Sequence, residues 1–391
     1  MKKTILLCFI IVYCLPVQAQ SPYIHKVFDF RPAPGQFVNK MPVYEEGDTH
    51  ADMIRKVEKE IKGNKQGLVS LGAYGGYVVF GFDHLVENRP GKYDFKIWGN
   101  AYYSNPSNTT RGSSEPGIVW VSFDENGNGI PDDIWYEIAG SEYYKPETIR
   151  NYSIIYYKPD EDKIPTPDHS FPFFTDTTYI KWTDNQGNKG YVIKNSTHHD
   201  NSYYPQWLDE ETITFQGVKL ANNGMDISGN GSFFVQYNYP WGYADNHPNE
   251  SLSSNFDIDW AVDENGNKVN LPGIHFVKVY TGVNQYCGFL GETSTEIMGA
   301  EDFHIQGIDI DVLAAKPETF HNTHLYYFQN RLHLLNLEGY VCSIFSIHGQ
   351  LECHLQILDS YVVQNIKLPA GFYIAKIQNQ NQIKTLKFLI P

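Results

Sequence analysis

Short apolar runs separated by glycine, proline and asparagine turns fill the chain between about residues 68 and 280. Runs of roughly four to eight residues, repeated at a spacing of roughly 8 to 12 residues, are typical of the strands of an all-β sandwich. The strands expected from this pattern span residues 68–71, 77–82, 93–98, 118–123, 134–138, 152–157, 212–215, 232–237 and 274–280.

Two of these strands differ in the surroundings that their side chains predict. Residues 93–97 alternate between apolar and polar side chains, which predicts one face toward solvent. Residues 117–123 are apolar on both faces, which predicts a strand in the middle of the domain.

One segment near the start of the domain has a helical period instead. Met53, Val57 and Ile61 recur on a polar background after Asp48, a candidate N-cap, and before Gly63. We expect a single amphipathic helix that covers the sandwich. Residues 22–47 are expected to be rich in loops and to wrap the domain as an extended arm, because Pro32, Pro34 and Pro42 break any long element.

The final part of the chain contains regular strands with few glycines, at residues 332–335, 341–347, 355–358, 361–366, 371–377 and 383–390. A module of roughly 70 residues with this pattern is typical of a small Ig-like β-sandwich. The predicted fold is therefore all-β: a jelly-roll-like β-sandwich with one covering helix over residues 20–315, followed by an Ig-like module over residues 322–391.

The first 19 residues have the pattern of a secretory signal peptide. Lys2 and Lys3 precede an apolar run over residues 5–16, and small residues lead to Ala19. We expect export by Sec, cleavage before Gln20 and no membrane insertion of the mature chain, because no other stretch approaches the roughly 20 apolar residues of a spanning helix. Lipidation at Cys14 is disfavoured by the bulky Tyr13 before it.

The composition indicates the environment of the protein and excludes some classes of partner. Aromatic residues make up 15% of the chain and charged residues only 19%, with 32 glycines, as in extracellular β proteins. Without the two signal-peptide lysines, 28 basic residues face 45 acidic ones, a formal net charge of −17. This balance argues against nucleic acid or an anionic membrane surface as a partner, because both require a basic surface.

Three cysteines follow the signal peptide: Cys287, Cys342 and Cys353. Cys342 and Cys353 lie on two apolar runs that flank His348 and Gly349, so a hairpin would bring them near each other. A disulfide in an oxidising compartment and two separate small buried side chains are both compatible with this pattern.

The C-terminal module resembles the sorting domain at the end of many Bacteroidetes proteins secreted by the type IX (Por-type) system. The resemblance rests on the stretches at residues 346–350, 368–377 and 386–390. It implies a partner in the secretion machinery. The chain departs from the family at residues 326–330, where a Tyr-Pro-Asn-Pro-like start is usual.

The larger domain resembles an uncharacterised family of Bacteroidetes cell surface proteins, some of whose members carry PKD repeats. The resemblance rests on residues 70–77, 81–84, 114–119, 135–142, 241–246 and 291–296. It implies a jelly-roll-like sandwich at the extracellular or outer-membrane surface, with no catalytic residues to transfer. The resemblance also implies two possible ligand classes, a carbohydrate and a cobalamin-like molecule.

A candidate calcium site lies in the loop at residues 124–133. Oxygen-bearing side chains at its first, third and fifth positions, a glycine at the sixth and a main-chain carbonyl at the seventh match the first half of an EF-hand loop. Position 12 is Trp135, so closure would fall to the two aspartates at the end of the loop. Hard oxygen ligands favour Ca²⁺, and the alternative is a plain hairpin turn. The predicted ligands are Asp124, Asn126, Asn128, Ile130 through its carbonyl, Asp132 and Asp133.

Aromatic residues in loops rich in glycine, asparagine and aspartate are the second candidate site, because aromatic faces stack on ligands while amides and carboxylates direct hydrogen bonds. The predicted ligand-binding residues are Tyr102, Tyr103, Trp207, Trp241 and Tyr243. Each of them has a core role as its alternative.

The sequence gives little support to catalysis. His198, His199 and Asp200 and the acids Asp209, Glu210 and Glu211 do not form a recognisable hydrolase motif. We therefore expect a secreted, cell-surface, non-catalytic binding protein with a structural calcium ion. A secreted hydrolase of unrecognised type and a structural adhesion or envelope protein are the alternatives.

Overall fold

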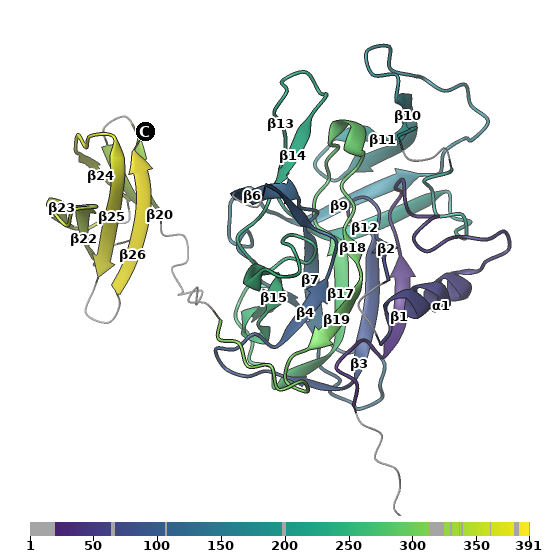
Figure 1. The fold of residues 1–391 in the computed structure, drawn as a ribbon, viewed down its shortest axis with the longest axis horizontal. Helices are drawn as coiled ribbons and strands as arrows, with labels where there is room; N and C mark the ends of the chain where they lie inside the picture. The colour runs from purple at the N-terminus through teal and green to yellow at the C-terminus, as the bar shows by residue number, and fades with distance from the viewer. Residues whose placement is uncertain are drawn as a thin grey trace, which may run out of the picture. The chain divides into compact units, whose positions relative to one another are not determined.

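The computed structural model describes residues 20–63, 67–105, 108–197, 201–312, 324–328, 331–335, 337, 339–359, 361–378 and 383–390 (Figure 1). The expected signal peptide lies outside this part of the chain. The chain divides into two compact units, Met1–Ala314 and Ala315–Pro391. Within the described residues, no helix is long and apolar enough to cross a membrane.

The first unit is built around a six-stranded antiparallel sheet. Its strands lie in the order β1 (Lys26–Arg31), β3 (Tyr77–Glu87), β17 (Gly273–Thr281), β7 (Gly117–Ser122), β8 (Trp135–Ile138) and β16 (Ala261–Val262). The strand predicted to be central, β7, pairs with β17 on one side and β8 on the other. Ile118, Val119 and Val121 are fully buried, because both faces of the strand are covered.

A second antiparallel sheet packs on the first through a layer of aromatic side chains. Its strands lie in the order β11 (Lys189–Asn195), β10 (Phe174–Asp184), β9 (Ile149–Tyr157) and β12 (Thr212–Lys219). Tyr74 lies edge-on to both Tyr152 and Tyr280, and Phe215 on β12 lies edge-on to Tyr77 on β3. These rings bury a large apolar area between the sheets. The prediction of an all-β sandwich with one helix is confirmed.

Three smaller sheets complete the first unit, as Figure 1 shows. They are β13 (Gly224–Asp226), β14 (Phe234–Tyr237), β6 (Asn108–Ser113) and β5 (Tyr102–Asn105); β15 (Asn255–Phe256), β4 (Phe95–Trp98) and β19 (Gly299–Asp302); and β18 (Glu296–Ile297) with β2 (Val69–Ser70). Short 3₁₀ helices occupy Leu252–Ser254, Ile258–Trp260 and Gly288–Leu290.

The predicted helix is α1 (His50–Ile61), and its three periodic apolar residues are its buried ones. Its N-cap is Thr49, not Asp48. Thr49 accepts the N–H of Asp52, and the Asp52 side chain accepts the N–H of Thr49, which completes a capping box. Asp48 instead binds Lys56 across the first turns of the helix.

One local expectation is incomplete and one is wrong. The arm at residues 22–47 contains β1, which pairs with β3 over residues 26–31. The strand around residue 95 has no solvent-facing side, because Asp94 is fully buried and Lys96 nearly so. Asp94 accepts the N–H groups of Arg89 and Ile258, so contacts from distant segments replace the water that its pattern predicted.

The second unit is a small sandwich of two antiparallel sheets. One contains β20 (His324–Phe328), β21 (Arg331–Leu335) and β24 (Tyr361–Asn365), and the other contains β23 (Leu351–Gln356), β22 (Val341–Ser346), β25 (Gly371–Gln378) and β26 (Ile383–Ile390). Its apolar core is separate from that of the first unit. Cys342 and Cys353 are free thiols here, opposite Leu355 and Ile344 in the β22–β23 register.

Candidate functional site

The loop at residues 124–133 connects two neighbouring strands of the main sheet, β7 and β8. Two glycines, Gly127 and Gly129, have φ angles of 69° and 70°, a conformation that favours glycine. The loop is exposed over most of its length, but it is anchored at its start, where the N–H of Asp124 donates to Nδ1 of His275 on β17 at 3.1 Å.

Side-chain oxygens of the loop turn inward and order its backbone. The Asp124 carboxylate accepts the N–H groups of Asn128 at 3.1 Å and Gly129 at 2.9 Å. Asn126 and Asn128 each accept the N–H two residues further on, at 2.9 and 2.7 Å. The Asp132 carboxylate lies within 3.1 to 3.3 Å of the amide nitrogens of Asn126 and Asn128. Four of the predicted ligands are therefore joined by hydrogen bonds within the loop.

The other two predicted ligands are placed differently. Asp133 accepts the N–H of Glu125 at 3.2 Å, so it closes the base of the loop. The carbonyl of Ile130 accepts the N–H of Asp132 at 2.8 Å. One of its lone pairs is thus used inside the loop.

The loop that begins at Asp263 shows which of these hydrogen bonds also occur in an ordinary turn. Asp263 accepts the N–H groups of Asn265 and Asn267 at 2.9 and 2.8 Å, as Asp124 does in its own loop. After Glu264 no acidic side chain follows in this loop, and Lys268 comes where the first loop continues toward Asp132. The difference between the loops is therefore the acid at the end of the loop.

The structure separates the five predicted aromatic ligands. Tyr102 is 59% exposed on β5, and Tyr103 beside it donates to or accepts from His247 at 3.0 Å. Trp241 is partly buried against Trp260.

Trp207 and Tyr243 are core residues, at 9% and 1% exposure, so the surface position predicted for them is wrong. Trp207 packs between Phe30 and Tyr44. The hydroxyl of Tyr243 accepts the N–H of Glu142. Their loops fold back onto the sheets, which the local sequence did not indicate.

Among the residues considered for catalysis, the described part of the chain includes Asp209, Glu210 and Glu211. Glu210 forms an ion pair with Arg31 at 2.8 Å on the surface. His198, His199 and Asp200 lie outside the described residues.

Sequence reasoning missed a cluster of three carboxylates. Glu115, Asp245 and Glu296 come from three distant segments, and their oxygens lie within 4.8 Å of one another. Asp245 and Glu296 are 3% and 5% exposed. Asp245 has a φ of 51° and accepts three backbone N–H groups, from Asn100, Ala101 and Glu296, at 2.8 to 2.9 Å.

Burial raises the pKa of all three carboxyls, and the charge of Glu115 raises it further at Asp245 and Glu296. The side chains of Glu115 and Glu296 are hydrogen-bonded to each other, which requires a proton between them. Oxygens at this spacing suit a hard divalent cation. The shared proton and the backbone donors already satisfy them from within the protein, so we assign the cluster a structural role.

Two buried histidines of the first unit contact aspartate carboxylates. His84 lies between Asp302 at 2.9 Å and Asp83 at 2.7 Å, and His304 contacts Asp94 at 2.8 Å. Burial lowers the pKa of His84, but its two carboxylate partners raise it more, and the net shift is upward. The His84–Asp302 contact links β3 to β19, and the His304–Asp94 contact links the segment after β19 to the segment before β4.

No protein-family model matches the chain, and no curated protein matches it. One solved structure that aligns with it is PorZ, an essential bacterial surface component of the type-IX secretion system of Porphyromonas gingivalis. It is 11% identical over 86% of this chain and 54% of PorZ, with a TM-score of 0.18. The chain thus spans about half of PorZ.

A second is the adhesin domain of Epf from Streptococcus pyogenes, 9% identical over 95% of this chain and 90% of that one, with a TM-score of 0.14. TM-scores this low carry no argument about function. The resemblance to a cell surface family and to a sorting domain therefore stays a prediction from the sequence.

Proposed function

We propose that this is a secreted, cell-surface protein that binds a ligand without catalysis and holds a structural calcium ion in the loop at residues 124–133. The observation that supports the calcium ion is the hydrogen-bonded network that joins Asp124, Asn126, Asn128 and Asp132 in an exposed loop. Two carboxylates and two amide oxygens are the ligands that Ca²⁺ prefers, and waters complete its shell at exposed sites.

A cation bound to this network changes the energetics of the loop. The loop carries four acidic side chains, at residues 124, 125, 132 and 133, and no basic one. The Asn126 and Asn128 amides contact Asp132 through nitrogen, and their oxygens accept the N–H groups of Asn128 and Ile130. Each amide must therefore reorient before its oxygen coordinates the ion. The loop joins two central strands, so an ion that orders it also holds their register.

Calcium is expected to raise the unfolding midpoint of the first unit. A ligand that binds only the folded state adds RT ln(1 + [L]/Kd), which is about 1 kcal/mol at a few-fold excess over a millimolar-range Kd and about 2 to 3 kcal/mol at a hundredfold excess. The measurement is thermal unfolding with added Ca²⁺ and with a chelator. An unchanged midpoint on chelation would leave the loop a plain hairpin turn.

Two variants sharpen this test. Asp124→Ala is expected to abolish the calcium-dependent shift. Asp263→Ala removes an aspartate that also accepts two backbone N–H groups, from a loop without a counterpart of Asp132, and its calcium-dependent shift should equal that of the wild type.

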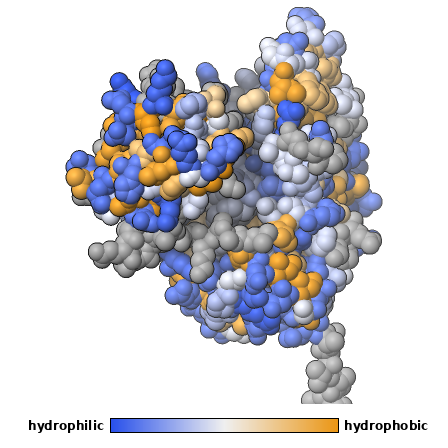
Figure 2. Space-filling model, turned by 60° about the vertical axis from the view of Figure 1, so that its left-hand side comes forward, coloured by the Kyte–Doolittle hydropathy of each residue, from blue (hydrophilic) through white to orange (hydrophobic). Residues whose placement is uncertain are grey.

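The ligand classes that we propose are a carbohydrate or a cobalamin-like molecule. Among the predicted aromatic residues, Tyr102 is the one whose ring is largely exposed. In Figure 2, hydrophobic residues are interspersed with hydrophilic ones over the face in view. Such mixed surfaces suit ligands that combine hydroxyl groups with apolar faces.

The second unit is proposed to engage the secretion machinery through one face of its larger sheet. Phe345 pairs with Leu351 on one side and Ile374 on the other, and Phe372 continues the same face. Phe372 and Leu351 are 61% and 52% exposed. Exposed apolar side chains gathered on one sheet face are typical of a contact surface.

A chain that ends after Thr319 is expected to be exported, folded and retained in the periplasm, because the first unit has its own core but lacks this surface. The measurement is surface accessibility of the protein in a host with a type IX system. Phe372→Lys in the full chain should reduce display, and Gln356→Lys, at an exposed polar position of the same sheet, should not. Unchanged display of the truncated chain would make the module an accessory domain.

A further inference from the structure

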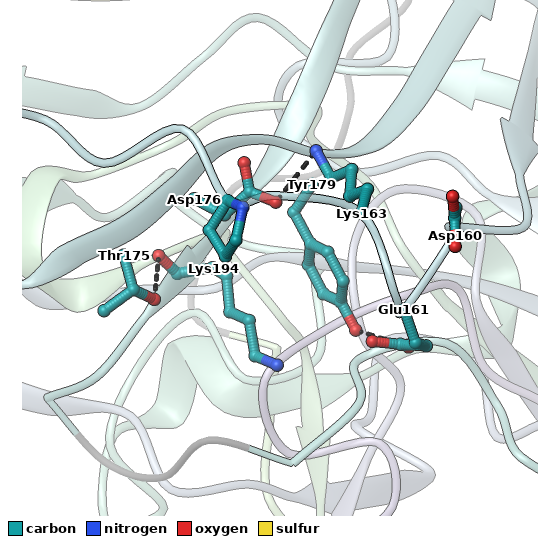
Figure 3. Close-up of a pocket in the computed structure, with 8 residues that line it drawn as sticks. Asp160, Glu161, Lys163, Thr175, Asp176, Tyr179 and Lys194 are labelled. Carbon is teal, nitrogen blue, oxygen red and sulfur yellow. Dashed lines mark hydrogen bonds and ion pairs between the residues drawn. The ribbon is translucent and has the colours of Figure 1, made fainter.

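A cavity of about 220 Å³ lies between β10, β11 and the loop that precedes β10. Figure 3 shows charged and hydroxyl-bearing side chains around it. Those that decide its chemistry are Asp160, Glu161, Lys163, Asp176, Tyr179 and Lys194. A space of this size is smaller than a pocket for a drug-sized ligand and suits one small polar molecule.

Most of the polar groups around the cavity are held in place by partners inside the protein. Lys163 forms an ion pair with the buried Asp176 at 2.8 Å and donates to the carbonyl of Thr178. Burial by itself raises the pKa of Asp176, but Lys163 and the N–H of Thr178 outweigh it, and the net shift is downward. Tyr179 donates to Glu161 at 2.7 Å.

Lys194 differs from Lys163 in its partners. Its ammonium group lies 4.9 Å from the centre of the Tyr179 ring, and no ion pair of Lys194 is found among the described residues. In Figure 3 the side chain runs along Tyr179, with its ammonium directed away from the Lys163–Asp176 pair. Lys194 is partly exposed, and an ammonium without a carboxylate partner is suited to an anionic group, because a charge-assisted hydrogen bond is stronger than its neutral counterpart.

The other charged groups around the cavity restrict the charge and the functional groups of that anion. The lining holds two ammonium and three carboxylate groups, so a dianion such as phosphate meets stronger net repulsion than a singly charged carboxylate does. Asp160 and Glu161 accept hydrogen bonds, and are therefore suited to hydroxyl groups of the same ligand. A molecule with one carboxylate and several hydroxyls satisfies both sides.

We propose that this cavity binds one hexuronic acid unit of a glycan, with the sugar carboxylate on Lys194 and its hydroxyls toward Asp160 and Glu161. The proposal rests on the non-catalytic binding function proposed above and names its ligand class and site. It places recognition on the second sheet, away from the calcium loop, which joins β7 and β8 of the first.

Saturation-transfer NMR measures the binding of sodium glucuronate to the whole mature chain. Glucose and inorganic sulfate are the comparison ligands. Glucuronate is expected to bind, glucose to bind at least about tenfold more weakly, and sulfate not to displace glucuronate at equal concentration. Equal binding of glucose, or displacement by sulfate, would overturn the proposal.

Variants separate the cavity from the rest of the surface. Lys194→Gln should weaken glucuronate binding about tenfold or more, and Lys194→Arg should retain most of it. Lys181→Gln is the matched control, because Lys181 is an exposed lysine on β10 that lies 5.0 Å from the Tyr157 ring, outside the cavity. Equal effects of Lys194→Gln and Lys181→Gln would contradict the assignment.

The calcium-dependent unfolding shift is measured on the same preparations. A chain that shows this shift but no selective glucuronate binding overturns the cavity proposal and leaves the calcium site standing. Glucuronate binding without a calcium shift supports the cavity and contradicts the calcium site.

Discussion

Replacing Asp245 with alanine will destabilise the first unit by about 3 kcal/mol or more, since each buried donor left without a partner costs about 1 to 3 kcal/mol. The Asp245 carboxylate accepts three backbone N–H groups from two segments that are far apart in the sequence. Its loss also opens space in a closely packed region, where an added Cβ at Gly99 would lie 2.4 Å from its Oδ1. Relief of repulsion from Glu115 and Glu296 offsets part of this cost.

Asp245→Asn separates the two effects. It keeps an oxygen for Asn100 and Ala101, removes the charge and turns an amide toward the N–H of Glu296, so we expect a smaller loss of stability than for alanine. The measurement is denaturant unfolding of the first unit. Asp226→Ala is the control, because Asp226 also accepts backbone N–H groups, from Ser228 and Gly231, but at an exposed turn. An equal effect of Asp226→Ala and Asp245→Ala would contradict the role given to the buried cluster.

The free energy of unfolding is expected to fall as the pH rises from about 5 to 8. Burial raises the pKa of Glu137 and Glu292 to about 8 and that of Asp257 to about 7. In this window the folded protein holds protons that the unfolded chain releases, so stability falls as the pH rises and is greatest near the unfolded pKa values. Burial lowers the pKa of His247 and His275, an opposing effect confined to pH values below their ordinary pKa of 6.5.

Glu292→Gln isolates one of these groups. One Glu292 oxygen accepts the N–H of Gln36 at 2.7 Å, and glutamine retains that bond. Glutamine does not ionise, so the variant should gain up to about 3 kcal/mol relative to the wild type between pH 5 and pH 8, at 1.36 kcal/mol per pKa unit.

Denaturant unfolding at pH 5, 6.5 and 8 measures this difference. Glu147→Gln, at an exposed glutamate, removes the same charge from the surface and should follow the wild type. Parallel pH profiles for the wild type and Glu292→Gln would show that Glu292 releases its proton in the folded state as readily as in the unfolded chain.

Local patterns in the sequence determined the secondary structure and the candidate calcium loop. Periodicity identified Met53, Val57 and Ile61 as the buried face of the helix, and the continuously apolar run at residues 117–123 identified the central strand. These predictions succeed because the neighbours that decide them are a few residues away along one element. The spacing of oxygen side chains in the loop at residues 124–133 is likewise a local property.

Tertiary structure alone decided which polar and aromatic side chains are buried. Asp94 alternates with apolar residues as a surface residue would, yet segments around Ile258 and His304 cover it. Trp207 and Tyr243 sit in polar loops, but those loops fold onto the sheets. Glu115, Asp245 and Glu296 share no sequence spacing, since strand pairing over long sequence distances brings them together. Burial depends on which distant element covers a face, and an alternating or loop-like pattern is the same whether that cover is protein or water.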